Sequence, residues 1–215
     1  MKKEEVLGAL RATGVVAVIR TEHSSDLVSV AQALSAGGVR LVEITLTVPG
    51  ALDVIRDSVA RLGKKAYVGA GTVLDAAAAH DAIDAGAAFV VSPGLDAQTV
   101  ALCNEAGIAV MPGAFTPHEI LQAWKAGADV VKVFPADLGG PEYIKTVKEP
   151  LPQVELLPTK GITLDSAPAF IRAGAVAVGA GGALVSGAMI RSKEYTRITE
   201  NASSFIRAVR AAREG

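Results

Sequence analysis

Two charged side chains stand inside apolar runs of this sequence, where a charge is costly. Lys132 lies in the run of residues 128–135, and Glu43 lies in the run of residues 39–46. Both runs read as β-strands, and moving a charge out of water into such a strand costs several kcal/mol. A buried lysine therefore tends to release its proton, and the neutral amine attacks carbonyl carbon, as in Schiff-base enzymes. Lys132 and Glu43 are the candidate catalytic residues.

Composition restricts the classes of protein that this chain can belong to. Its 215 residues suit one large domain, which we expect to span residues 1–215. The net charge of −1 and the aromatic content of 4% argue against binding to nucleic acid or to a membrane surface. The single cysteine, Cys103, excludes an internal disulfide, and the three histidines are scattered without the spacing of a metal site. Neither a signal-peptide core nor an apolar segment of membrane length is present, so we expect a cytoplasmic protein.

A short phrase, Ala-Gly followed by an apolar run, recurs along the chain and indicates a repeated strand–helix unit. Each glycine of this phrase is expected to end a helix in the left-handed conformation. The phrases begin at Ala36, Ala85, Ala106, Ala126 and Ala173. Eight strands are predicted, at residues 15–19, 41–44, 67–69, 88–91, 109–111, 130–134, 155–157 and 176–179. Continuous apolar strands of this kind are typical of a parallel sheet that is buried on both faces.

Eight strand–helix units in 215 residues predict an α/β fold, a single (β/α)8 TIM barrel. An open, doubly wound sheet is the alternative, but no Gly-x-Gly-x-x-Gly phrase follows the first strand. We expect an extra N-terminal helix at residues 4–12 to close the floor of the barrel. A final amphipathic helix is predicted at residues 194–214.

In barrels of this type the chemistry takes place at the carboxyl ends of the strands. Side chains alternate along a strand, so Lys132 shares a face with Val130, and Glu43 shares a face with Leu41. If both faces point inward, the amine and the carboxylate meet in the mouth of the barrel. The alternative is a buried ion pair with a purely structural role.

Glycines follow the seventh and eighth predicted strands, at Gly161 and within residues 179–182. We expect them to expose backbone N–H groups at the start of a helix, a geometry that binds phosphate. The loops after strands 7 and 8 are also the usual phosphate site of this barrel. The alternative is that these glycines serve only tight turns.

Six phrases of the sequence together resemble one enzyme family, the 2-keto-3-deoxy-6-phosphogluconate (KDPG) aldolases, which overlap with the 4-hydroxy-2-oxoglutarate (KHG) aldolases. The phrase around Lys132 is the most diagnostic. The phrases run in family order through nearly the whole chain: Val42-Glu43-Ile44-Thr45, Val68-Gly69-Ala70-Gly71-Thr72-Val73, Val91-Ser92-Pro93-Gly94, Met111-Pro112-Gly113, Lys132-Val133-Phe134-Pro135 and Pro158-Thr159. The resemblance implies a class I aldolase that needs neither metal nor cofactor and usually assembles as a homotrimer.

The resemblance also implies roles for individual residues. Lys132 is implied to be the Schiff-base lysine, and Glu43 the general acid/base. Thr72 is implied to bind the pyruvyl carboxylate, between walls formed by Pro93 and Phe134. A phosphate site is implied for a further set: Thr159, Gly161, Gly181 and Gly182.

Three positions depart from the usual pattern of the family. Thr47 stands where many members have an arginine that helps to hold the carboxylate, so we expect Arg20 to supply that cation. We place both Thr47 and Arg20 among the predicted substrate-binding residues. Gly182 replaces a frequent serine. Lys160, also a predicted substrate-binding residue, replaces the first glycine of the usual Pro-Thr-Gly-Gly phrase, where it can either add a charge to the phosphate site or clash with the phosphate.

The predicted reaction is the reversible cleavage of KDPG to pyruvate and glyceraldehyde 3-phosphate through a Schiff base on Lys132. The partner of the protein is then a small 2-keto acid, phosphorylated in this interpretation. An aldolase for KHG or for a galactose-configured analogue is the nearest alternative. A phosphosugar isomerase or epimerase with Glu43 as its base, and a non-catalytic phosphosugar-binding barrel, are more distant alternatives.

Overall fold

The computed structural model describes residues 3–22 and 26–214, in which strands and helices alternate along most of the chain. The strands are β1 (Val15–Ile19), β2 (Leu41–Thr45), β3 (Tyr67–Gly71), β4 (Phe89–Val91), β5 (Ala109–Met111), β6 (Gly113–Ala114), β7 (Val131–Val133), β8 (Leu156–Pro158) and β9 (Val178–Ala180). The helices are α1 (Lys3–Thr13), α2 (Leu27–Ala36), α3 (Ala51–Leu62), α4 (Ala76–Asp84), α5 (Ala97–Glu105), α6 (Pro117–Lys125), the 3₁₀ turn η1 (Ala136–Leu138), α7 (Gly140–Lys148), α8 (Ala167–Arg172), α9 (Gly187–Arg191) and α10 (Tyr195–Glu214). None of the helices in these residues is long and apolar enough to cross a membrane.

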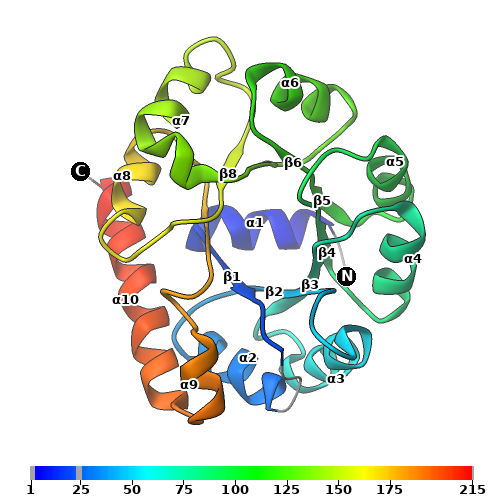
Figure 1. The fold of residues 1–215 in the computed structure, drawn as a ribbon, viewed down its shortest axis with the longest axis vertical. Helices are drawn as coiled ribbons and strands as arrows, with labels where there is room; N and C mark the ends of the chain where they lie inside the picture. The colour runs from blue at the N-terminus through cyan, green and yellow to red at the C-terminus, as the bar shows by residue number, and fades with distance from the viewer. Residues whose placement is uncertain (1–2, 23–25, 215) are drawn as a thin grey trace.

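The strands pair in parallel and form a curled sheet, around which the helices make an outer ring (Figure 1). One part of the sheet has the order β5-β4-β3-β2-β1-β9, and the other has the order β6-β7-β8. The break between β5 and β6 falls at Pro112, which has no N–H group to donate to a neighbouring strand. Backbone hydrogen bonds nevertheless cross both seams, from Asp129 to Val110 at 3.1 Å and from Val176 to Leu156 at 3.0 Å. The predicted α/β class with a parallel sheet is confirmed.

The predicted strands are found, and the differences lie mainly at their ends. The last strand, β9, begins at Val178 rather than at residue 176, because its ladder with β1 starts at the pair Val15 and Val178. The two-residue strand β6 was not predicted, since so short a segment carries no periodic signal. The expectation that Gly37 is left-handed is wrong: its φ is −80°, and Gly38 takes the left-handed conformation with φ 97°. Gly37 instead lets α10 approach closely, because a Cβ there would collide with Ala202.

Alternate residues along the sheet belong to two separate apolar clusters. Val42 and Val131 belong to the larger cluster, which lies between the sheet and the surrounding helices. Leu41 and Val130 belong to a second cluster inside the curl of the sheet, together with Phe89. Since side chains alternate along a strand, the residues two positions after Leu41 and Val130 point to the same inner side.

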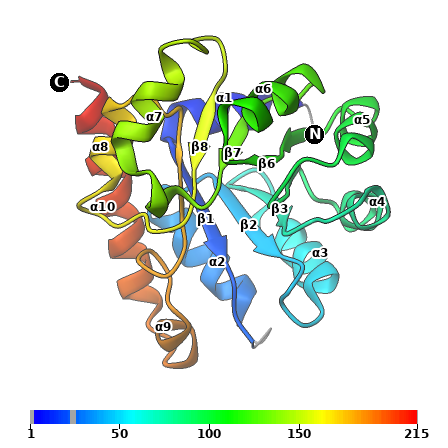
Figure 2. The same cartoon turned by 45° about the horizontal axis from the view of Figure 1, so that its top comes forward.

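Helix α1 covers one end of this interior. Its buried residues Val6, Leu7 and Leu10 belong to the inner cluster, in contact with residues from most of the strands. In Figure 2 the arrows of β1 and β2 point away from α1, so the helix covers the end at which the strands begin. The predicted N-terminal helix is therefore present, and the carboxyl ends of the strands are left accessible on the opposite side.

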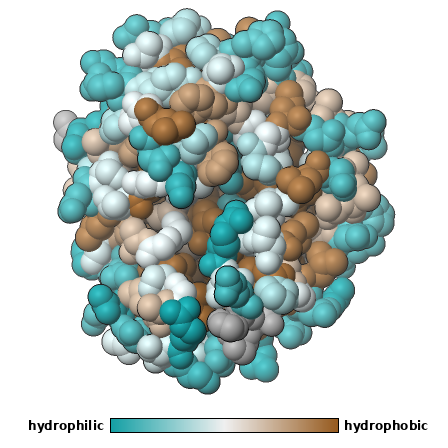
Figure 3. Space-filling view, viewed as in Figure 1, coloured by the Kyte–Doolittle hydropathy of each residue, from teal (hydrophilic) through white to brown (hydrophobic). Residues whose placement is uncertain are grey.

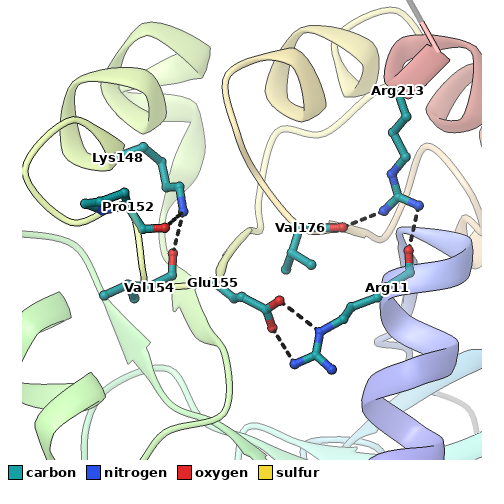
Figure 4. A network of polar contacts seen from close by, with 7 residues as sticks. All are labelled: Arg11, Lys148, Pro152, Val154, Glu155, Val176 and Arg213. Carbon is teal, nitrogen blue, oxygen red and sulfur yellow. Dashed lines mark hydrogen bonds and ion pairs between the residues drawn. The ribbon is translucent and has the colours of Figure 1, made fainter.

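A network of polar contacts ties the C-terminal helix to α1 on the covered side (Figure 4). The Arg213 guanidinium donates to the carbonyl of Val176 at 2.6 Å and to those of Arg11 and Ala12 at 2.7 and 3.2 Å. Arg11 in turn forms a two-pronged ion pair with Glu155, at 2.9 and 3.0 Å. The Arg213 side chain thus joins α10 to the end of α1 and to the segment before β9.

We expect Arg213→Ala to lower the free energy of unfolding by about 1–2 kcal/mol, because it removes charge-assisted hydrogen bonds at a partly exposed site. Urea denaturation measures this loss. Arg210→Ala, on the exposed surface of the same helix, is the matched control and should leave the stability within about 0.5 kcal/mol of wild type. Equal effects of the two substitutions would show that the contacts of Arg213 contribute nothing of their own.

Candidate active site

Lys132 is held in the middle of strand β7, on its inner face. Its partners in the ladder are Gly113 on β6 and Leu157 on β8, and its N–H donates to the Pro112 carbonyl at 2.9 Å. The residue is 5% exposed. Its Nζ lies 5.3 Å from the centre of the Phe134 ring, within the range of a cation–π contact. The lysine is therefore a buried amine at the carboxyl end of the sheet interior.

Glu43 occupies the inner face of β2, where it pairs with Gly69 of β3. It is 1% exposed, and its Oε1 has no hydrogen-bond partner. Gly71 makes room for this carboxyl group, because a Cβ at that position would overlap Oε1. Burial raises the pKa of Glu43 above its ordinary 4.5, and the charges of Lys132 and Arg20 act in the opposite direction. Such a carboxyl group is suited both to donate and to accept a proton.

The amine and the carboxyl group face the same interior, as the alternation of side chains predicts. The charge of Lys132 is close enough to lower the pKa of Glu43 against the effect of burial. Within the described part of the chain, however, none of the ion pairs joins the two. The structure therefore does not show the buried ion pair of the alternative interpretation, and Lys132, unlike Glu43, lines a pocket.

Arg20, which follows β1, forms hydrogen bonds to threonines that follow the neighbouring strands β2 and β3. Its guanidinium donates to Thr72 Oγ1 at 3.0 Å and to Thr47 Oγ1 at 3.4 Å. Thr47 Oγ1 lies 2.9 Å from Thr45 Oγ1, and either oxygen can donate. Thr72 adopts φ 57°, which is uncommon for a residue other than glycine and shows that the surrounding structure dictates its conformation. Three predicted substrate-binding residues are thus in one network.

A pocket of about 480 Å³ opens at the carboxyl ends of the strands. Figure 3 views this side of the molecule and shows a hollow near its centre, with apolar surface inside and strongly hydrophilic atoms at its edge. Eight of the predicted site residues line the pocket: Arg20, Lys132, Phe134, Thr159, Lys160, Gly161, Gly181 and Gly182. The structure therefore brings the candidate nucleophile and the predicted phosphate residues to one opening.

Pro93 does not line this pocket but a neighbouring one of about 370 Å³. Phe134 lines both pockets, so the two adjoin at this residue. Gly113 lets the start of β6 pack closely against the segment after β4, since a Cβ at Gly113 would collide with the Pro93 carbonyl. Glu43, Thr47 and Thr72 also lie outside the lining of the main pocket. Each is next to a residue that does line it: Thr47 and Thr72 accept hydrogen bonds from Arg20, and the charge of Lys132 acts on Glu43.

The prediction that Gly161 and the glycines of residues 179–182 stand at the start of a helix is wrong: α8 begins only at Ala167 and α9 only at Gly187, and Gly179 lies within β9. After β9 the chain first makes a turn in which the N–H groups of Leu184 and Val185 donate to the Gly181 carbonyl, at 2.8 and 2.9 Å, and α9 begins only afterwards. Because this turn follows Gly181, α9 begins several residues later in the sequence, at Gly187. Gly179 serves packing, because a Cβ there would collide with Thr159 Oγ1.

Several residues of the site were not predicted, and Gly71 and Val18 are two of them. Gly71 leaves the space that the Glu43 carboxyl group fills, and Val18 lines the main pocket. A signal was present for both: Val18 is two residues before Arg20 on the same strand face, and Gly71 ends the strand next to β2. Within the described residues, no three His, Cys, Asp or Glu side chains gather in a way that could hold a metal ion. His23 lies outside the described residues.

The order and geometry of these residues agree with the comparison to known proteins. The family described as KDPG and KHG aldolase matches residues 6–201 of the chain. This protein belongs to the KDPG and KHG aldolase family. The resemblance inferred from the six phrases is confirmed, and so is the prediction of an aldolase, which is a carbon–carbon lyase.

Individual relatives resemble the chain over most of its length. The 2-dehydro-3-deoxy-phosphogluconate aldolase of Treponema pallidum is 34% identical over 198 residues, which cover 90% of this chain and 92% of the relative. The KHG/KDPG aldolase of Escherichia coli is 33% identical, over 94% of each chain. The solved KDPG aldolase of Legionella pneumophila, with pyruvate captured at low pH as a covalent carbinolamine intermediate, has a TM-score of 0.82 at 29% identity and covers 91% of this chain and 95% of its own.

Proposed function

We propose that this member of the family is a class I aldolase that cleaves KDPG reversibly to pyruvate and glyceraldehyde 3-phosphate through a Schiff base on Lys132. One observation carries the proposal: the buried Lys132 amine, which lines an open pocket, faces the same interior as the buried Glu43 carboxyl group, whose Oε1 has no hydrogen-bond partner. The covalent pyruvate adduct of the Legionella pneumophila relative supports the same chemistry. In this proposal Lys132 is the nucleophile and Glu43 moves the protons.

The cleavage direction begins when the neutral Lys132 amine attacks the C2 carbonyl carbon of the substrate. Glu43 donates a proton to the resulting hydroxyl group, which leaves as water and gives an iminium. The Glu43 carboxylate then accepts the proton of the C4 hydroxyl, the C3–C4 bond breaks, and its electrons pass to the iminium nitrogen as an enamine. Glyceraldehyde 3-phosphate leaves, Glu43 returns the proton to C3, and water hydrolyses the iminium to pyruvate and free lysine.

The remaining predicted residues bind the two ends of the substrate in this proposal. The hydrogen bonds of Arg20 to Thr47 and Thr72 support a site for the substrate carboxylate, with Arg20 as the cation. Phe134 forms the wall beside the pyruvyl carbons, and Pro93 lines the neighbouring pocket that Phe134 also lines. The other end of the pocket takes the phosphate, and the residues proposed for it are Thr159, Lys160, Gly161, Gly181 and Gly182.

We further propose that the curled sheet is a closed (β/α)8 barrel and that residues 1–215 form one domain. Support for closure comes from the backbone hydrogen bonds across both seams, with β5 and β6 taken as one interrupted strand. The homotrimer and the cytoplasmic location remain predictions. Light scattering on the purified protein tests the trimer.

The choice of substrate is tested by measuring pyruvate release in an assay coupled to lactate dehydrogenase. We expect kcat/KM for KDPG to exceed that for KHG by at least about 10-fold, because only KDPG carries a phosphate for the glycine-lined end of the pocket. The galactose-configured analogue tests the preference at C4. A higher value for KHG would favour the alternative substrate, and no pyruvate from any of the three would contradict the proposed aldolase activity.

A further inference from the structure

The main pocket is lined by cationic side chains and by no acidic ones. Its charged lining residues are Arg20, Lys132 and Lys160, whereas the whole chain has a net charge of −1. The nearest buried carboxyl group, that of Glu43, lies behind this lining. A concave surface with charges of one sign concentrates ligands of the opposite sign. The pocket is therefore built for an anionic ligand.

The cations stand at different strand ends. Lys160 follows β8 and Arg20 follows β1, and β9 lies between these strands, since it pairs with β1 and its Gly179 bridges to Thr159. Two strand spacings separate such positions by roughly 10 Å at the level of the sheet. One substrate with an anionic group at each end can therefore contact both side chains.

Lys160 lines the pocket and has a strained backbone conformation. Its φ is 87°, in the region that favours glycine, and Gly161 follows with φ 73°. The surroundings dictate this conformation: the N–H of Thr159 donates to Val133 at 3.0 Å, and a Cβ at Gly161 would collide with Asp137. A residue other than glycine is disfavoured in this region, because its Cβ crowds the backbone. Lys160 thus occupies a backbone conformation that a glycine would adopt with less strain.

The ammonium group of Lys160 is not used within the protein. Across the residues that the structure describes, no ion pair and no side-chain hydrogen bond involves Lys160, and the residue is exposed at the pocket. Lys193, the other lysine with positive φ, at 52°, forms an ion pair with Asp26 at 3.0 Å. The strain at Lys160 has no such internal compensation.

We propose that Lys160 is a specificity-determining residue: its ammonium binds the substrate phosphate and makes the enzyme prefer phosphorylated over unphosphorylated keto acids. This inference rests on the proposed function. A phosphate monoester carries more negative charge at neutral pH than a carboxylate, so a lysine at this point favours the phosphate over the distal carboxylate of a dicarboxylic substrate. Lys160 is remote from the bond that breaks, so its contribution falls on binding rather than on the chemical step.

The test is Lys160→Gly, because glycine adopts the observed backbone conformation without strain. We expect KM for KDPG to rise about 10-fold with kcat changed by less than about 3-fold, and binding of inorganic phosphate, followed by ³¹P NMR, to weaken by a similar factor. KM for the unphosphorylated 2-keto-3-deoxygluconate should stay within about 2-fold of wild type. The thermal midpoint should be equal to or above that of wild type, since strain is relieved. A lysine with a merely structural role would lower that midpoint and leave the preference for phosphate unchanged.

Lys193→Gly is the matched control, since it also relieves a positive φ but lies outside the lining of the pocket. It should change neither KM nor phosphate binding. Unchanged phosphate binding in Lys160→Gly, or an equal rise of KM for phosphorylated and unphosphorylated substrates, would overturn the inference. The proposed function is tested separately by covalent trapping of pyruvate, which has no phosphate; if trapping fails in the wild type, the comparison of inorganic phosphate binding still decides the role of Lys160.

Discussion

Lys132→Ala is expected to lose at least about 10³-fold in kcat/KM for KDPG and to lose all covalent labelling by pyruvate and borohydride. The physical reason is that the iminium nitrogen, which accepts the electrons of the breaking C3–C4 bond, comes from this side chain. Labelling is measured by mass spectrometry of the reduced protein, followed by sequencing of the modified peptide. We expect the modification on the peptide that contains Lys132 and nowhere else.

Two further variants keep this prediction decisive. Lys132→Met retains most of the buried volume, so a loss of labelling in both variants cannot be assigned to collapse of the cavity left by alanine. Lys160→Ala keeps Lys132 and should still be labelled by pyruvate. Labelling that persists in Lys132→Ala and disappears in Lys160→Ala would move the nucleophile to Lys160.

Glu43→Gln is expected to lower kcat by roughly 10²–10⁴-fold while pyruvate binding is kept. Glutamine has nearly the shape of glutamate, so it fills the space beside Gly71, but it cannot transfer a proton. Steady-state kinetics and the affinity for pyruvate separate the two effects. Turnover within a few-fold of wild type would remove Glu43 from the mechanism.

The same variant has a second readout in the pH dependence of stability. Burial raises the pKa of Glu43 in the folded protein, so the folded state binds more protons than the unfolded state between the ordinary value of 4.5 and the raised one. The free energy of unfolding of the wild type therefore falls as the pH rises through this interval, and Glu43→Gln lacks this contribution. In urea denaturation from about pH 4 to about pH 8, the stability of the variant relative to wild type should increase with pH. A constant difference would contradict the raised pKa.

The sequence alone identified the chemical groups and the neighbours with which each shares a strand face. Lys132 and Glu43 are conspicuous because charges are rare in apolar strands, and the alternation of side chains puts them on the faces of Val130 and Leu41, which the structure shows to be the inner ones. Such inferences succeed because they depend on local backbone geometry, which is the same in every strand. The family also follows from short phrases, because each phrase is a contiguous part of one strand end.

Other features of the site depend on distances between separate strands, and only the tertiary structure decided them. The Glu43 carboxyl group fits because Gly71 on β3 leaves the space for it, its Oε1 has no hydrogen-bond partner, and Lys132 on β7 forms no ion pair with it. Pro93 lines a separate pocket, which shares Phe134 with the main one, and a turn that closes on the Gly181 carbonyl comes before the start of α9. No local pattern encodes these arrangements, since each is set by how closely residues from distant parts of the chain can pack.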